Sequence, residues 1–254
     1  MIPLVLLGAS GRMGRAVAEA AAAGGGFELR ACVDREIPRG AASPEWNTDL
    51  SAVLRGGDVV IEFSSPAAAA AAATVCAERG ARLVSGTTGL DATQERAMTA
   101  AAERTAVLRA SNFSVGVLAL RRALASALAA LPEWDLEIVE RHHRLKADSP
   151  SGTALTLAQD ALAARGWPAS ALVNGRAGRL GARPDAQIGL HAVRGGSFVG
   201  DHTVLFAGPG ESLELRHVAQ DRAAFAQGAL KAARFVADAP PGAYTLEAVL
   251  PAGR

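Results

Sequence analysis

Short, mostly apolar runs alternate with Ala-rich stretches along the first half of the chain. The runs Ile2–Leu7, Leu29–Val33, Val59–Phe63, Arg82–Ser85 and Ala106–Ala110 each have the length of a strand. Strands that are apolar along their whole length are typical of a parallel sheet covered by helices on both faces. The stretches between these runs are strong helix formers. We therefore expect an α/β fold with a Rossmann-type parallel sheet.

The pattern changes after residue 113. The long apolar segment Val115–Leu131 predicts a helix, and Leu136–Arg141 and Thr153–Arg165 predict a strand and a second helix. The stretch Asn174–Ala186 is polar and rich in Gly and Arg, which predicts a mobile loop. From Ile188 to Val218, short alternating segments broken by glycines predict a β-meander. A mixed sheet with two helices indicates a smaller α+β domain.

These two patterns predict two domains. Residues 1–113 are expected to form a dinucleotide-binding domain together with residues 222–254, because a terminal helix such as the one predicted there often packs back on the first domain. Residues 114–221 are expected to form the second domain.

The composition is that of an ordinary globular protein, with 254 residues of which 50% are hydrophobic and 20% charged. The formal net charge of +1 gives no general attraction to nucleic acid or anionic membranes, so neither partner is expected. Cys32 and Cys76 lie in apolar runs without a paired motif, which indicates core residues in a reducing compartment and hence the cytoplasm. The chain starts directly with a strand pattern, so we expect no secretory signal.

The first apolar run leads into a glycine-rich turn, Gly8-Ala-Ser-Gly-Arg-Met-Gly14, and then into a predicted helix. Glycine lets the backbone approach a pyrophosphate, and a helix N-terminus offers free N–H groups to it. The spacing is G-x-x-G-x-x-G, and an ordinary turn could also give it, but its place between a strand and a helix favours nucleotide binding. The residues expected to contact the cofactor here are Gly8, Ala9, Ser10, Gly11, Arg12 and Met13.

Asp34 ends the second predicted strand, 20 residues past Gly14 (34 − 14 = 20). An acidic side chain at this place would hold the ribose hydroxyls of an adenosine. The neighbouring Arg35 could accept a 2′-phosphate, helped by Arg12, although a solvated surface charge is an equal alternative. We expect NADH, NADPH or both as cofactor and leave the preference open.

Small and polar residues also follow the later strands, in the loops Phe63–Ser65, Gly86–Thr88 and Ala110–Phe113. Ligands of open α/β sheets lie at the carboxyl ends of the strands, so these loops should border the same cofactor. Any one of them could be a simple turn, and their recurrence is the stronger argument. The further expected cofactor contacts are Gly86, Thr87, Thr88, Ala110, Ser111, Asn112 and Phe113.

The densest chemistry lies between Glu140 and Leu155, where two histidines, three cations and a Ser-Gly-Thr turn fall close together. Histidine can donate a proton near neutral pH. His142 and Lys146 are four residues apart, which places them on one face of either a strand or a helix. His143 would point elsewhere unless the strand ends there.

Pro150 and the Ser-Gly-Thr turn after it predict a helix start whose free N–H groups can bind a carboxylate. Each of these residues also has an alternative interpretation. The histidines could be structural, and Lys146 could be a surface charge or a Schiff-base lysine. His191, His202 and His217 are expected to be structural, because no carboxylate or Cys spacing supports a metal site.

With these motifs in view, the chain resembles the 4-hydroxy-tetrahydrodipicolinate reductase (dihydrodipicolinate reductase) family over nearly its whole length. The resemblance rests on Gly8–Gly14, Ser85–Leu90, Ser111–Gly116, Glu140–Leu155 and Gly200–Thr203 with Gly210-Glu211. It implies NADH- or NADPH-dependent reduction of 4-hydroxy-tetrahydrodipicolinate to tetrahydrodipicolinate in lysine and diaminopimelate biosynthesis. The substrate is then a small cyclic dicarboxylate with a carbon–nitrogen double bond.

The resemblance also implies roles for particular residues. His142 would be the proton donor and acceptor, Lys146 a second proton donor, and His143, Gly152 and Thr153 the substrate contacts. The second domain would bind substrate, and its open mixed sheet would build a homotetramer. No metal is implied.

Two residues depart from the family pattern. Leu145 stands where a further His is frequent, and Asp34 stands where Glu is common, which leaves the balance between NAD and NADP open. Two other functions remain as alternatives. One is a different two-domain nicotinamide enzyme, such as an amino-acid dehydrogenase, and the other is a nucleotide-sensing protein without turnover.

Overall fold

The computed structural model describes residues 1–41 and 43–250. They divide into two compact units, which are described separately below. The first unit comprises Met1–Val115 together with the chain from Arg222 onward, and the second comprises Gly116–Asp221.

The first unit is built on a seven-stranded sheet in the order β12-β6-β5-β4-β1-β2-β3, and every neighbouring pair is parallel. The strands are β1 (Ile2–Leu7), β2 (Phe27–Val33), β3 (Glu45–Asn47), β4 (Val59–Glu62), β5 (Arg82–Ser85), β6 (Ala106–Arg109) and β12 (Gly242–Thr245). The predicted Rossmann-type α/β sheet is thereby confirmed. The short strands β3 and β12 lie at the two edges and lack the long apolar runs by which the other strands were recognised.

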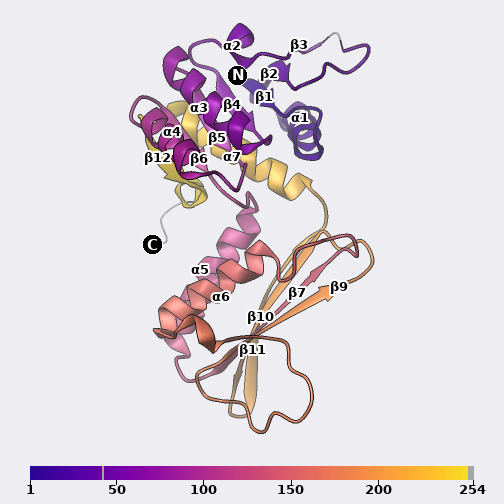
Figure 1. Cartoon of the computed structure of the whole chain (residues 1–254), viewed down its shortest axis with the longest axis vertical. Coiled ribbons are helices and arrows are strands. Elements are labelled where there is room, and N and C mark those ends of the chain that lie inside the picture. Colours follow the sequence, from indigo (N-terminus) through magenta and orange to yellow (C-terminus); the bar gives the residue numbers. More distant parts are fainter. Residues whose placement is uncertain (42, 251–254) are drawn as a thin grey trace. The chain divides into compact units, whose positions relative to one another are not determined.

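Helices cover both faces of this sheet (Figure 1). They are α1 (Arg12–Gly24), α2 (Leu50–Val53), α3 (Pro66–Arg79), α4 (Ala92–Ala102), α7 (Ala223–Asp238) and the short 3-10 turn η2 (Leu246–Val249). The helices α3 and α4 pack together over alternate strand residues such as Val5, Val60 and Leu83. On the other face, α7 packs beside α1 and against β4 to β6, so the end of the chain completes this unit.

The helix starts in this unit follow the sequence signals. Pro66 occupies the first turn of α3, and Ser65 caps it by accepting the N–H of Ala68. Asp91 and Gln94 form a reciprocal capping box at α4. These caps therefore fix where the loops after β4 and β5 end and where the helices begin.

The second unit has a five-stranded sheet in the order β11-β10-β7-β9-β8. Its elements are the strands β7 (Asp135–His142), β8 (Leu172–Asn174), β9 (Ile188–Arg194), β10 (Gly200–Gly208) and β11 (Glu211–Ala219), the helices α5 (Val115–Ala130) and α6 (Gly152–Arg165), and the turn η1 (Ala169–Ala171). The predicted mixed sheet with two helices is confirmed.

The predicted β-meander is wrong in its connectivity. Only β10 and β11 are consecutive antiparallel neighbours. The earlier strand β7 lies between β9 and β10, antiparallel to β10 and parallel to β9. Alternation of apolar residues fixes which face of a strand is buried, but it does not select the neighbour, and this is why the sequence pattern misled.

The alternation along β7 divides its side chains between two environments. Leu136 and Ile138 join the core that α5 and α6 form with the sheet (Figure 1). Glu140 and His142 continue the same buried face toward the end of the strand. The end of β7 that carries Glu140 and His142 is therefore a direct extension of the hydrophobic core.

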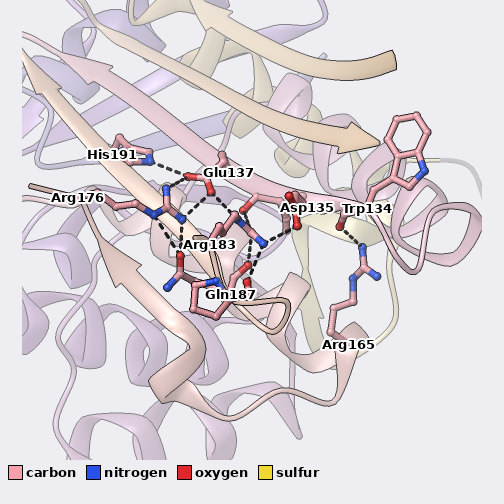
Figure 2. A network of polar contacts seen from close by, with 10 residues as sticks. Trp134, Asp135, Glu137, Arg165, Arg176, Arg183, Gln187 and His191 are labelled. Carbon is pink, nitrogen blue, oxygen red and sulfur yellow. Dashed lines mark hydrogen bonds and ion pairs between the residues drawn. The ribbon is translucent and has the colours of Figure 1, made fainter. Parts of the chain in front are cut away.

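The opposite face of β7 carries an ionic network (Figure 2). The Glu137 carboxylate accepts from Arg176 at 2.8 Å, Arg183 at 3.2 Å and His191 at 2.8 Å. Burial alone would raise the pKa of Glu137, but these hydrogen bonds lower it to about 2. Arg176 and Arg183 lie in the loop predicted between residues 174 and 186, and they tie that loop to β7.

Candidate active site

The glycine-rich turn after β1 brings three backbone segments close together. Gly8 has a φ of +79°, and a Cβ there would lie 2.3 Å from the carbonyl oxygen of Phe63. A Cβ at Gly14 would lie 2.3 Å from the carbonyl oxygen of Gly8. Gly11 is the N-cap of α1 and supplies no side-chain cap to its first N–H groups. The turn thus has the close approach and the uncapped helix start that a pyrophosphate requires.

Asp34 lies beside this turn. Its carboxylate accepts the Ser10 N–H at 2.9 Å, the Ser10 hydroxyl at 2.5 Å and the Arg35 N–H at 2.8 Å. Burial would raise the pKa of Asp34, yet the bonds from Ser10 and Arg35 lower it. The structure therefore brings together Ser10, Asp34 and Arg35, with Arg12 and Met13 in the first turn of α1.

Glu62, the last residue of β4, is fully buried and collects donors from two strand ends. Its carboxylate accepts the Ser64 N–H at 2.5 Å and three hydroxyls, those of Ser64 at 2.6 Å, Thr87 at 2.6 Å and Ser85 at 2.7 Å. The loops after β4 and β5 are therefore fastened to each other through one side chain.

Phe63 connects the loop after β4 to the loop after β6. Its ring meets Phe113 edge to face, with centroids 5.4 Å apart. A Cβ at Gly86 would lie 2.0 Å from the Phe63 ring, so only glycine fits there. Thr88 and Ser111 are exposed, while Ala110 and Asn112 are half-buried in their loops. The predicted cofactor residues after β1, β4, β5 and β6 thus lie at one end of the sheet.

These groups fit a dinucleotide. The glycine cradle has no room for side chains, the start of α1 is uncapped, and a carboxylate ends β2 next to the turn. Gly8–Met13 would hold the pyrophosphate, Asp34 the adenosine ribose, and the loops after β4 to β6 the other half.

In the second unit the most constrained group is Glu140. Its fully buried carboxylate accepts from His142 Nδ1 at 2.6 Å, from the Ser151 N–H at 2.9 Å and from both terminal nitrogens of Arg194 at 2.7 and 2.8 Å. Burial would raise the pKa of Glu140, but the bonds from Arg194, His142 and Ser151 lower it. A charged acceptor therefore holds one nitrogen of His142.

The His142 ring also contacts a second histidine. The rings of His142 and His202 lie edge to face, 5.2 Å apart. His202 Nε2 is 3.1 Å from the Ser151 hydroxyl, and its buried Nδ1 has no hydrogen-bond partner. Burial, together with the nearby His142, lowers the pKa of His202 to about 4. Gly200 lies beside His142 Nε2, which a Cβ there would approach to 3.3 Å.

His143 and Lys146 lie in a turn and not on a continued strand. The strand ends at His142, the His143 N–H donates to the Phe198 carbonyl, and the Lys146 N–H donates to the His143 carbonyl at 3.1 Å. Neither a strand nor a helix runs from His142 to Lys146, so the secondary structure does not place them on a shared face. The Lys146 ammonium pairs with Asp148 at 2.8 Å.

The helix start predicted after Pro150 is confirmed. Ser151 caps α6 by accepting the Ala154 N–H at 3.2 Å, while its own N–H is bound to Glu140. Gly152 begins the helix with open space where a Cβ would be, and Thr153 follows it in the first turn. The α6 start and His142 are thus connected through one carboxylate.

Sequence reasoning missed the groups that organise these residues. Glu140 and Arg194 received no role, although the even spacing of Glu140 and His142 on a strand was a usable signal. Arg194 lies opposite His142 in the parallel register of β7 and β9, which the expected meander obscured. His202 was expected to be structural, and the structure places it against His142. Glu62 was also passed over.

The parallel sheet, the glycine cradle and the acidic end of β2 define an oxidoreductase of the Rossmann class that uses a pyridine nucleotide. Two family models match the chain, the N-terminus of dihydrodipicolinate reductase over residues 2–113 and its C-terminus over residues 116–250. The chain belongs to the dihydrodipicolinate reductase family, whose members act in lysine and diaminopimelate biosynthesis.

Curated relatives agree. The chain is 44% identical to the 4-hydroxy-tetrahydrodipicolinate reductase of Anaeromyxobacter sp. (strain Fw109-5), with 98% of each chain covered. It is also 44% identical to that of Thiobacillus denitrificans (strain ATCC 25259 / T1), again over 98% of each chain. These matches confirm the predicted family and the predicted reductase activity.

Solved structures support the fold. A dipicolinate-bound dihydrodipicolinate reductase from Paenisporosarcina sp. TG-14 matches with a TM-score of 0.81 and 26% identity, covering 98% of this chain and 100% of that one. The diaminopimelate dehydrogenase of C. glutamicum matches with a TM-score of 0.55 and 14% identity, covering 99% of this chain and 96% of that one. The second likeness concerns the fold alone.

Proposed function

We propose that the chain reduces 4-hydroxy-tetrahydrodipicolinate to tetrahydrodipicolinate with His142 as the proton donor. The observation that carries this proposal is the buried Glu140–His142 pair, with Nδ1 and carboxylate oxygen 2.6 Å apart. The product has a hydrogen in place of one hydroxyl of the substrate, so the balanced reaction consumes one hydride and one proton and releases the hydroxyl as water. The reduced nicotinamide supplies the hydride when bound, and the protein must supply the proton.

Glu140 prepares His142 for this task. Holding Nδ1–H fixes the tautomer and the ring orientation, which leaves Nε2, beside Gly200, as the nitrogen that exchanges a proton. The bidentate bond from Arg194 keeps the Glu140 carboxylate charged, so it stays an acceptor for His142 Nδ1. His202 stays neutral at working pH because its pKa is about 4. It therefore adds no positive charge that would compete with a protonated His142.

The two carboxylates of the substrate require positive or N–H partners. We assign them to the first turn of α6, with Gly152 and Thr153, and to His143 in the turn after β7. Lys146 is the second proton donor in this proposal. For that role it has to leave Asp148, which holds it at 2.8 Å through a half-exposed surface pair.

We propose that both NADH and NADPH serve as cofactor. Asp34 offers an acceptor for free ribose hydroxyls, and Arg35 and Arg12 offer cations for a 2′-phosphate. The mixture of one carboxylate with two arginines supports dual use. It contrasts with a site built for one cofactor only.

The test is a coupled assay. The aldolase product of pyruvate and aspartate semialdehyde is generated in place, and absorbance at the reduced nicotinamide band reports turnover. Consumption of NADH or NADPH is expected only when that product is present. No oxidation would refute the assignment, turnover with oxaloacetate and ammonia would indicate an amino-acid dehydrogenase, and binding without turnover would indicate a nucleotide sensor.

We further propose a cytoplasmic homotetramer built through the open face of the five-stranded sheet. On the face opposite α5 and α6, Val193 and Val218 are 43% and 46% exposed and flank Arg141 and Asp201 in register. The free cysteines suit a reducing compartment. Sedimentation should give four copies, and Val218→Asp should yield smaller species.

Among residues 1–41 and 43–250, no helix is long and apolar enough to cross a membrane.

A further inference from the structure

We propose that Glu62 is a positioning residue that turns the hydroxyls of Ser64 and Thr87 into acceptors for the nicotinamide half of the cofactor. The inference rests on the proposed use of a nicotinamide nucleotide. It adds a residue to that site and a rule for what the site can recognise, namely groups that donate hydrogen bonds.

Glu62 cannot itself touch a ligand, because its side chain is completely buried. It acts through its partners. The hydroxyls of Ser64, Thr87 and Ser85 lie 2.6, 2.6 and 2.7 Å from its oxygens, and the Ser64 N–H is 2.5 Å away. A carboxylate has about four lone-pair sites and no hydrogen, so it can only accept. Each of these contacts therefore fixes the direction of one donor.

A hydroxyl has a single hydrogen and two lone pairs. With its hydrogen committed to Glu62, a hydroxyl can offer only lone pairs to anything else. Thr87 additionally accepts the Ser64 N–H at 3.1 Å, which leaves it one lone pair. Phosphate needs donors, and this pair of hydroxyls has none to give. A ribose hydroxyl or a carboxamide NH2 can donate, so those are the groups this site fits.

The order of strands indicates which half of the cofactor this is. The sheet runs β2-β1-β4-β5, with Asp34 after β2, the glycine turn after β1, Glu62 ending β4 and Thr87 after β5. If Asp34 holds the adenosine ribose and the glycine turn the pyrophosphate, the nucleotide continues toward β4 and β5. The acceptors set by Glu62 then meet the nicotinamide ribose or its carboxamide.

The decisive variant is Glu62→Gln, which keeps the size of the side chain and replaces one acceptor oxygen with an NH2 group. That group donates, so at least one hydroxyl must reverse and present its hydrogen where a lone pair stood. The titration is calorimetric, with NADH and with ADP, which has the same adenosine and both phosphates but neither the second ribose nor the nicotinamide. Neither ligand requires the substrate, so a failed coupled assay leaves this test intact.

The expected result is a loss of NADH affinity of about tenfold or more, which is about 1.4 kcal/mol. Affinity for ADP should change by less than about twofold, since the adenosine and phosphates are held by Asp34 and the glycine turn. Equal losses for both ligands would show that Glu62 only supports the fold of the loops. Unchanged affinity for both would show that the orientation of the hydroxyls is irrelevant. Either outcome overturns the proposal.

A second variant protects the test against a folding failure. Thr87→Val removes the hydroxyl while keeping the branched shape, and it should weaken NADH selectively in the same way. When Glu62→Gln and Thr87→Val are combined, their losses of NADH affinity should not add, because both substitutions act through the same contact. Additive losses would contradict the coupling. Glu95→Gln is the matched control, since Glu95 pairs with Arg109 at the surface and should leave both affinities unchanged.

Discussion

Glu62 ends β4 in the first unit, and Glu140 lies near the end of β7 in the second, and both carboxylates are fully buried. Glu62 receives only neutral donors, three hydroxyls and a backbone N–H. Glu140 receives a guanidinium, an imidazole and a backbone N–H. The difference separates two uses of a buried charge, one that orients dipoles and one that holds the ring of the histidine proposed to transfer a proton.

This division follows the chemistry expected of each unit. A site that must bind a cofactor and release it again needs oriented dipoles and no proton to exchange with the cofactor. A substrate that must gain a proton needs an acid whose conjugate partner stays ionised.

Replacing His142 should give the largest effect. His142→Gln removes the acid while keeping an amide that can bond Glu140, and kcat should fall about 10²- to 10⁴-fold. The affinity for NADH, measured by calorimetry, should stay within about twofold, because the glycine turn and Asp34 lie on other strands. His191→Gln is the control, since that histidine binds Glu137 on the opposite face of β7. An equal collapse of NADH affinity would make His142 structural.

Removing the cation that pairs with Glu140 should mainly reduce the stability of the fold. Arg194→Met leaves a buried carboxylate with fewer partners, and the free energy of unfolding in urea should fall by about 3–5 kcal/mol. Arg216→Met is matched to it, because Arg216 also binds a buried carboxylate, Asp201, which keeps Arg141. That variant should lose clearly less, because the Arg216 side chain is 54% exposed and its pair with Asp201 is screened by solvent. Similar losses in both variants would show that the Glu140 site is not special.

His202 gives the second unit a dependence on pH. Its pKa is about 4 in the folded protein against 6.5 when free, so the unfolded chain takes up a proton first as the pH falls. The stabilisation is complete above pH 6.5 and is lost as the pH falls to about 4, a change of about 3 kcal/mol. His202→Gln should flatten this part of a curve of unfolding free energy against pH. An unchanged slope would assign it to other groups.

The smallest effect concerns the choice between cofactors. Asp34→Ser removes the negative charge beside Arg35 and should shift the ratio of kcat/KM toward NADPH by about tenfold. The Ser10 contacts are lost as well, so the kcat/KM for NADH should decline. Glu28→Gln serves as a control for a general loss of negative charge, since Glu28 is an exposed residue of β2. No change in the ratio would mean that the ribose is held by other groups.

Much of the first unit could be predicted from its sequence, because strands buried on both faces have a distinct apolar signature. The predicted runs ending at Leu7, Phe63 and Ser85 located the strand ends to within one residue, and the loops after these ends carry predicted cofactor residues. The edge strands β3 and β12 were missed because Glu45–Asn47 and Gly242–Thr245 are short and mostly polar. Edge strands need no apolar face pattern of that kind.

The second unit was harder, because its partnerships are long-range. The role of Arg194 depends on β9 lying parallel to β7, and alternation along Ile188–Arg194 does not indicate that neighbour. The residues His142 and Gly152 could be located from one dense motif. The groups that hold them, Glu140, Arg194 and His202, come together only through the folding of three strands.

The most direct test of the division is a comparison of steady-state kinetics in two variants. Glu62→Gln should raise the KM for NADH about tenfold with kcat within about threefold of the wild type, and Glu140→Gln should lower kcat about tenfold or more with the KM for NADH within about twofold. This crossed pattern is expected if the two carboxylates have separate tasks. If both substitutions changed the same parameter, the two buried carboxylates would not have separate tasks.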